Sequence, residues 1–352
     1  MPISSSRLTA MWREVLTLSK LCPDEHVLVL TSTNSDERLR RAAIQAVTDL
    51  GATVCRLDVE PFWDRREAGA DPISVTGVSP IDGNPIAFTA MKEADLVIDL
   101  MHLLFTPAQR AVIESGTRML LAYEPPEILA RLMPTMDDRR RVLAAREAYS
   151  KGKEIRVTSE AGTDLRAKIG ETRITAEYGF VDEPGRWDHW PAAFVARVPN
   201  KQTAEGTVVI NAGDIIIPFK FYVQSPIRLT IERGFITKIE GGNDADFMKR
   251  YLEEYEEPNA YAVSHLGWGL HPKARWTSLG MYDKQPTIGM EARTYYGNFL
   301  FATGPGPDVK AHCHLDIPMR NCSFFIDDQP MTLKGEVIPE DQRVDRAQRT
   351  AG

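Results

Sequence analysis

A His-x-Asp triplet near the carboxyl end of the chain, His314-Leu-Asp316, has the residue types and the spacing of a metal site. Alternate side chains of a β-strand point to the same face, so the imidazole and the carboxylate would lie side by side. The third candidate ligand is His265, in the apolar segment 261–267, which is typical of a strand ending at a glycine. Two imidazoles and one carboxylate form the facial set that holds Fe(II) and leaves positions open for substrate and dioxygen.

Other interpretations of these histidines stay open on the sequence alone. An isolated His-x-Asp triplet can equally be a surface or hydrogen-bonding pair. His312 would share a strand face with His314 and competes with it for the role of ligand. The clustering favours a metal, because four of the seven histidines fall within the 50 residues from 265 to 314.

The segment 177–191 is a second concentration of reactive side chains. Two tryptophans flank the pair Asp188-His189, and they could sandwich a flat ring while His189 supplies a base. Glu177 could orient that imidazole or share its proton. The alternative is a tryptophan-anchored turn in which Arg186 and Asp188 form a structural ion pair.

Several common motifs are absent. Between the first expected strand and its helix the sequence reads Thr31-Ser-Thr-Asn-Ser-Asp, without G-x-G-x-x-G, and the chain has no P-loop. Neither a dinucleotide nor a nucleoside triphosphate is therefore expected. The absence of G-x-S-x-G and H-E-x-x-H argues against a serine hydrolase and a zincin protease.

Composition excludes further partners. The net charge of -7, without a basic stripe, gives no electrostatic basis for holding nucleic acid or an anionic membrane. No apolar run approaches the roughly 20 residues that span a bilayer. The four cysteines form no C-x-x-C pair, which favours a reducing compartment. We expect a cytoplasmic enzyme.

The first half of the chain predicts an α/β domain over residues 1–150 with a parallel sheet built from βαβ units. Pro, Gly and Asp make 60–90 mostly loop. Ser35 is the expected N-cap of the second helix. Strands are expected at 26–30, 53–59, 94–100 and 117–122, and helices at 8–18, 35–50 and 106–116.

The second half predicts a β-rich α+β metal-binding domain over 151–341, after a charged helix at 137–150. A hairpin is expected at 227–239, and residues 342–352 are expected to fray as a flexible tail. Strands are expected at 155–159, 165–169, 207–211 and 215–221, and one helix at 246–255.

The chain resembles the 2,5-dihydroxypyridine 5,6-dioxygenase family nearly from end to end. The segments that carry the resemblance are Leu121-Ala-Tyr-Glu-Pro-Pro-Glu-Ile-Leu-Ala-Arg, Asp182-Glu-Pro-Gly-Arg-Trp-Asp-His-Trp-Pro, Ser264-His-Leu-Gly-Trp-Gly-Leu, Tyr296-Gly-Asn-Phe-Leu-Phe and Cys313-His-Leu-Asp-Ile-Pro.

This resemblance implies a mononuclear non-haem Fe(II) dioxygenase of the extradiol type. It would open the ring of 2,5-dihydroxypyridine between C5 and C6 to N-formylmaleamate, using both atoms of O₂. The resemblance places the iron ligands on His265, His314 and Asp316, and the acid/base residues on His189 and Glu177. Ligation by neutral imidazoles implies that activity falls below about pH 6. We also expect a homo-oligomer.

The family shares its architecture with two-metal aminopeptidases, which supplies an alternative function. Those peptidases typically carry Gly-Glu where this chain has Ser264-His265, and Pro-Gly-Glu where it has Pro184-Gly-Arg186. The chain therefore lacks carboxylates that a two-metal site needs. It also departs from the dioxygenase pattern, with Phe105 where a histidine is common and Ala302 where a serine is common.

Overall fold

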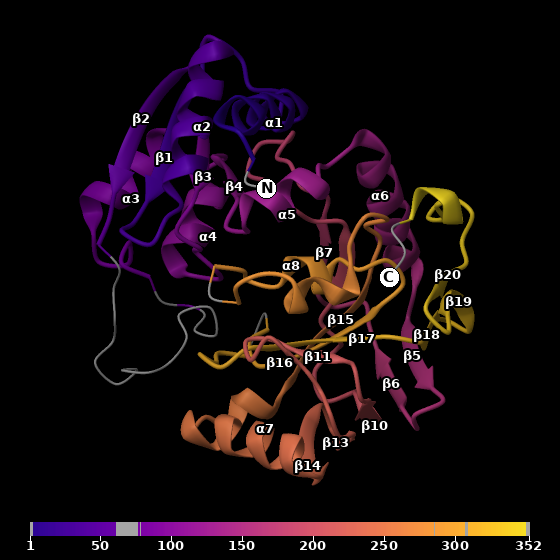
Figure 1. The fold of residues 1–352 in the computed structure, drawn as a ribbon. Coiled ribbons are helices and arrows are strands. Elements are labelled where there is room, and N and C mark those ends of the chain that lie inside the picture. Colours follow the sequence, from indigo (N-terminus) through magenta and orange to yellow (C-terminus); the bar gives the residue numbers. More distant parts are fainter. Residues whose placement is uncertain (1–2, 61–76, 78, 285, 307–308, 350–352) are drawn as a thin grey trace. The chain divides into compact units, whose positions relative to one another are not determined.

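The computed structural model describes residues 3–60, 77, 79–284, 286–306 and 309–349, in two compact units (Figure 1). The first unit comprises Met1–Met136, Glu177–Ala192 and Gln285–Ile288, and the second comprises Asp137–Ala176, Ala193–Lys284 and Gly289–Gly352. Within the described ranges, no helix has the length and apolar character needed to cross a membrane.

The first unit is built on a parallel five-stranded sheet with the order β2-β1-β3-β4-β8. This arrangement confirms the α/β fold predicted for the N-terminal half. The strands are β1 (His26–Thr31), β2 (Thr53–Asp58), β3 (Leu96–Asp99), β4 (Arg118–Leu121) and β8 (Trp187–His189), and the helices are α1 (Ser5–Leu18), α2 (Glu37–Asp49), α3 (Pro85–Glu93), α4 (Pro107–Glu114) and α5 (Pro126–Arg131).

Side-chain caps determine where two of these helices begin. Thr106 accepts the backbone N–H of Gln109 and so caps α4, as its position before Pro107 favours. Helix α2 is capped by Asp36, and the prediction of Ser35 as the cap is wrong. Ser35 instead donates its hydroxyl to the carbonyl of Leu100, because it lies in the turn after β1, next to the end of β3.

Strand β8 belongs to the first unit, whereas the sequence predicted that all residues from 151 to 341 belong to the second domain. It pairs with β4 in parallel register, with Leu121 opposite His189. Trp190 follows it and packs edge-on against Trp12, with ring centroids 5.0 Å apart. The predicted boundary at residue 150 therefore differs from the observed division, which also assigns α6 (Met136–Lys151) from Asp137 onward to the second unit. A strand of three residues is too short to show a periodic pattern.

The second unit contains an eight-stranded sheet, a five-stranded sheet and a two-stranded sheet, as the β-rich prediction requires. Their orders are β14-β13-β10-β6-β5-β18-β19-β20, β17-β16-β15-β9-β7 and β11-β12. The elements are β5 (Glu154–Ser159), β6 (Asp164–Lys168), β7 (Ile174–Glu177), β9 (Phe194–Arg197), β10 (Glu205–Ile210), β11 (Ile215–Ile216), β12 (Phe221–Tyr222), β13 (Ile227–Glu232), β14 (Phe235–Gly241), α7 (Asn243–Glu254), β15 (Val263–Gly269), α8 (Met290–Arg293), β16 (Phe299–Thr303), β17 (Leu315–Met319), β18 (Cys322–Ile326), β19 (Gln329–Leu333) and β20 (Glu336–Val337), with short 3₁₀ helices at Pro258–Tyr261, Trp276–Gly280 and Arg346–Gln348.

Two local predictions in this unit differ from the structure. The expected single strand at 215–221 is divided into β11 and β12, which pair with each other around the turn that contains Pro218. A proline has no N–H to donate to a ladder, so a continuous strand through Pro218 is disfavoured. The expected hairpin at 227–239 is confirmed by the antiparallel pair β13 and β14.

The C-terminal segment is anchored as far as residue 349, against the prediction of a fraying tail. Gln342 accepts a hydrogen bond from the indole N–H of Trp268 over 3.2 Å, and the backbone N–H of Val344 donates to the hydroxyl of Tyr296 over 2.9 Å. Val344 is also buried. These anchors are single contacts without periodicity, so the sequence pattern gave no sign of them; residues 350–352 lie outside the described residues.

A buried carboxylate ends β3. Asp99 accepts backbone N–H groups from Met101, His102 and Leu103, at 2.8, 3.0 and 2.8 Å, and so closes the turn that follows the strand. Burial raises the pKa of Asp99 to about 6, although the three hydrogen bonds act in the opposite direction. His102 lies in this turn with a φ of 66° and is half-buried rather than part of the core.

This raised pKa predicts a pH-dependent stability. A folded-state pKa above the unfolded value of about 3.9 means that the contribution of Asp99 is fully present below pH 4 and is lost as the pH rises through about 6. We expect the free energy of unfolding to fall by about 1 kcal/mol from this group between pH 5 and pH 7. Urea titrations at both pH values should show a smaller fall in Asp99→Asn, whereas an equal fall in the two proteins would contradict the assignment.

Candidate metal centre and acid/base pair

The three predicted ligands come from neighbouring strands of the five-stranded sheet. His265 lies on β15, Asp316 lies on β17, and His314 directly precedes β17. Strand β16 pairs with both β15 and β17 and so sets their spacing. The structure brings the three side chains together, with one potential ligand atom of each within 4.8 Å of the others.

The separations within this group fit a single ion. The Nε2 atom of His265 lies 3.0 Å from Oδ1 of Asp316, and Nε2 of His314 lies 3.4 Å from Oδ2 of the same carboxylate. Two ligand atoms bound to one ion at about 2.1 Å are roughly 3.0 to 3.4 Å apart when the angle between them is right or tetrahedral. His265 Nε2 and Asp316 Oδ1 therefore stand at a ligand-to-ligand distance, and the whole group, with one potential ligand atom of each residue within 4.8 Å of the others, is compact enough for a single ion.

Asp316 also has an unsatisfied buried oxygen. Its Oδ1 is inaccessible to solvent and meets the geometric criteria of no hydrogen bond, although Nε2 of His265 lies 3.0 Å away. Burial would raise the pKa of Asp316, but the charge of Arg293 and the contacts with His314 and His265 hold this pKa well below its usual range. A buried, ionised oxygen without a partner is a suitable ligand for a cation.

His314 has the orientation of a metal ligand. Its Nδ1 lies 2.8 Å from the carbonyl oxygen of Thr303, so the proton on Nδ1 is donated there and the lone pair is left on Nε2. The competing residue, His312, is half exposed and pairs with Glu257, whose Oε1 lies 2.5 Å from its Nδ1. His312 does not belong to the three-residue group.

The strand that carries His265 requires a glycine two residues later. A Cβ on Gly267 would clash with the carbonyl oxygen of Val195 and lie 2.7 Å from Cα of Ala196, both on the paired strand β9. Because these contacts are to backbone atoms, the neighbouring strand would have to move.

We therefore expect Gly267→Ala to destabilise the protein by at least about 2 kcal/mol and to weaken metal binding through displacement of His265. Urea unfolding and metal titration would measure the two effects. Gly280→Ala is the matched control, because its Cβ would meet nothing within 4 Å. Equal stability of both variants would contradict the tight strand packing.

Glu177 and His189 form a close pair at the ends of β7 and β8. Nδ1 of His189 lies 2.7 Å from Oε2 of Glu177, and both side chains are more than nine-tenths buried. A carboxylate that accepts the Nδ1 proton makes Nε2 the basic nitrogen of the ring. This arrangement is that of a histidine base oriented by an acid.

Asp188 fixes the backbone of this pair. Its carboxylate accepts the backbone N–H groups of Tyr178, Gly179 and His189, at 3.0, 2.9 and 2.8 Å. Burial raises the pKa of Asp188 to about 6. The charge of Arg186, whose Nη2 lies 2.5 Å from Oδ2 of Asp188, offsets part of this rise. The structural ion pair considered as an alternative is thus present, and it supports the Glu177–His189 pair instead of replacing it.

The two tryptophans of this segment have separate environments. Trp187 packs edge-on against the ring of His189, with centroids 4.5 Å apart. Trp190 is almost fully buried against Trp12. The prediction that both rings sandwich a flat substrate is wrong for Trp190, because its ring fills the core of the first unit.

The structure also shows how two further residues, Ala302 and Arg293, lie beside the three candidate ligands. Ala302 lies opposite Asp316 in the β16–β17 register and is fully buried, so the position where a serine is common faces the metal group. Arg293, at the end of α8, contacts the Asp316 carboxylate. No local pattern links an arginine to an aspartate 23 residues later, and only the fold brings them together.

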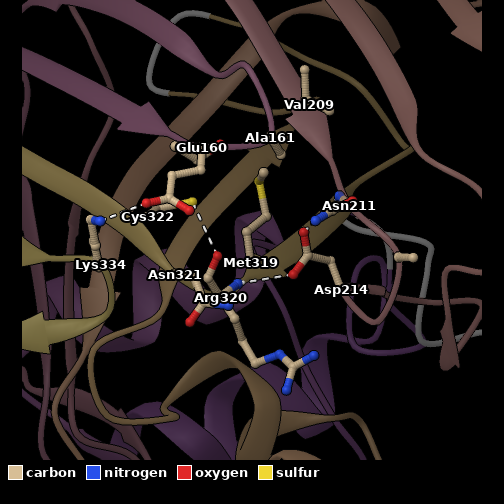
Figure 2. A pocket seen from close by; sticks show the side chains of 12 residues that line it. Glu160, Ala161, Val209, Asn211, Asp214, Met319, Arg320, Asn321, Cys322 and Lys334 are labelled. Atoms are coloured by element: carbon tan, nitrogen blue, oxygen red, sulfur yellow. Dashed lines mark hydrogen bonds and ion pairs between the residues drawn. The ribbon is translucent and has the colours of Figure 1, made fainter.

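The second unit has a separate hollow of about 370 Å³ at the ends of β5 and β10 and the turn between β17 and β18 (Figure 2). Asp214 anchors one wall by accepting the backbone N–H groups of Asn211 and Arg320, and burial raises its pKa to about 6. Lys334 pairs with Glu160 at the rim. The hollow is lined by none of the predicted ligands or acid/base residues.

Comparison with known proteins identifies relatives over almost the whole chain. The model of the 2,5-dihydroxypyridine 5,6-dioxygenase family matches residues 7–339. A curated protein of that name from Pseudomonas putida KT2440 is 45% identical over 348 residues, which cover 97% of this chain and 99% of the relative.

Solved structures give the same relation. The structure of 2,5-dihydroxypyridine dioxygenase from Pseudomonas putida KT2440 matches with a TM-score of 0.95 and 45% identity over 97% of this chain and 100% of that one. AmpT from Thermus thermophilus matches over 96% of this chain and 100% of its own, with a TM-score of 0.62 and 13% identity, which shows likeness of fold alone. The chain belongs to the 2,5-dihydroxypyridine 5,6-dioxygenase family.

Proposed function

We propose that this chain is a ring-cleaving dioxygenase that opens 2,5-dihydroxypyridine between C5 and C6, with Fe(II) held by His265, His314 and Asp316. The observation that carries the proposal is the convergence of these three side chains within 4.8 Å in a member of this family. The donor set supports the choice of ion, because two imidazoles and one carboxylate are the ligands of non-haem Fe(II) oxygenases. When bound, Fe(II) supplies the redox chemistry that dioxygen requires.

The overall reaction sets what the protein residues must do. Conversion of 2,5-dihydroxypyridine to N-formylmaleamate adds both oxygen atoms of one O₂ and changes neither the hydrogen count nor the nitrogen count. No external reductant is needed, and any proton taken from the substrate must be returned. The protein therefore needs a residue that can hold one proton during turnover.

We assign this task to His189 with Glu177. Nε2 of His189 takes the proton of the substrate 5-hydroxyl, and the carboxylate of Glu177, 2.7 Å from Nδ1, stabilises the imidazolium that results. The same nitrogen returns the proton once the ring has opened. The burial of both side chains supports this role, because water is kept from exchanging the stored proton.

The alternative of a two-metal aminopeptidase has no comparable support. His265 stands where those enzymes typically carry a glutamate, and Ser264 before it donates its hydroxyl to the carbonyl of Pro305. A second ion would also need bridging carboxylates, and within the described ranges the candidate group contains one carboxylate and two imidazoles.

Anaerobic loading with Fe(II), followed by oxygen-electrode and ultraviolet monitoring with 2,5-dihydroxypyridine, tests the proposal. We expect uptake of one O₂ for each ring absorbance lost, and no turnover in protein loaded with Zn(II). Hydrolysis of an aminoacyl anilide with two Zn(II) or Co(II) ions per subunit, without oxygen uptake, would overturn it. The homo-oligomer and the cytoplasmic location stay predictions, which light scattering and cell fractionation would test.

A further inference from the structure

Arg293 has a fixed position beside the candidate metal group. It is the last residue of α8, and the side-chain amide of Asn298 donates to the carbonyl groups of Ala292 and Arg293, at 2.8 and 3.0 Å. Only 11% of the Arg293 side chain is exposed, and its Nε lies 2.5 Å from Oδ2 of Asp316. The Arg293 residue is therefore fixed both at its backbone carbonyl and at its guanidinium.

This contact gives the two carboxylate oxygens of Asp316 different hydrogen-bonding environments. Oδ2 accepts a charge-assisted hydrogen bond from Arg293, whereas Oδ1 has no hydrogen-bond partner and lies 3.0 Å from Nε2 of His265. The backbone of Asp316 is also fixed, because its N–H and carbonyl pair with Ile217 at 3.1 and 2.8 Å. The carboxylate can neither rotate nor shift without breaking one of these bonds.

We propose that Arg293 is a positioning residue that restricts Asp316 to binding the metal through Oδ1 alone. A carboxylate can bind a metal with one oxygen or with both. Binding through both would require Oδ2 to leave the guanidinium. Restriction to Oδ1 keeps one more coordination position open for substrate or dioxygen, so this inference rests on the proposed function and deepens it.

The proposal predicts opposite changes in metal affinity and activity. In Arg293→Met, Oδ2 is released and a nearby positive charge is removed, so we expect the Fe(II) or Co(II) affinity to stay equal or rise up to about tenfold. Oxygen uptake with 2,5-dihydroxypyridine should fall about 10- to 100-fold, the range for residues that orient metal ligands. The visible absorption of the Co(II) protein should weaken, as it does when an additional ligand binds.

Two further variants complete the test. Arg293→Lys keeps the charge and should retain the wild-type metal affinity while recovering part of the activity. Arg250→Met, on the exposed face of α7, controls for the loss of a positive charge and should match the wild type. Metal affinity would be measured by chelator competition, with the thermal unfolding midpoint as a check on folding.

A fall in metal affinity of Arg293→Met in parallel with its activity would overturn the proposal, because it would show only structural support of the site. Wild-type affinity, spectrum and activity in Arg293→Met would overturn it as well. Failure of the proposed function itself has a different signature, since the wild-type protein would then take up no oxygen after loading with Fe(II).

Discussion

His314→Ala is expected to abolish metal binding and oxygen uptake together. The imidazole supplies one of three ligand atoms, and its Nδ1 is tied to the carbonyl of Thr303, so no other orientation of the ring is favoured. Removing it leaves one imidazole and one carboxylate for the ion. We expect the metal affinity to fall at least about a hundredfold and ring cleavage to become undetectable.

His312→Ala is the matched control for this variant. The residue is two positions away, its ring is half exposed, and it pairs with Glu257 outside the candidate group. Chelator competition and the oxygen electrode should give near wild-type values. Metal retained in His314→Ala and lost in His312→Ala would show instead that His312 is the ligand, which is the alternative that the sequence alone left open.

The second large effect is expected at the acid/base pair. His189→Ala should lower kcat by about 10² to 10⁴, the usual contribution of a positioned base. Glu177→Gln keeps the size of the side chain and removes the charge that stabilises the imidazolium, so a smaller loss, about 10- to 100-fold, is expected. The double variant should be no slower than His189→Ala, because the two residues act as a unit.

Metal affinity separates this role from a structural one. Both variants should bind Fe(II) as tightly as the wild type, and Glu183→Gln, at an exposed position of the same segment, should keep its activity. Loss of metal from His189→Ala would indicate damage to the fold. Full activity of His189→Ala would show that another group holds the proton.

Strand periodicity was sufficient to predict that two of the candidate ligands, His314 and Asp316, lie side by side. The alternation of His314, Leu315 and Asp316 places the two polar side chains on one face, and the short apolar run around His265 identified its strand. What the pattern could not give was the order of strands in the sheet. The interposed strand β16, which sets the spacing of the group, is known only from the structure.

Other features depend on contacts that have no local signature. Strand β8 contributes three residues to the sheet of the first unit, and the burial of Trp190 against Trp12 links positions 178 residues apart. The Asp316 carboxylate is held by Arg293 from a helix of four residues. In each case the residue types were visible in the sequence, and tertiary packing decided what they touch.

The most direct test of the central claim is an anaerobic titration of the metal-free protein with Fe(II), with oxygen uptake on 2,5-dihydroxypyridine measured at each addition. The account predicts that activity rises in proportion to added Fe(II) and stops rising at one ion per subunit, with no activity at any addition in His314→Ala. A break at two ions per subunit, or activity in His314→Ala equal to that of the wild type, would contradict a single ion held by His265, His314 and Asp316.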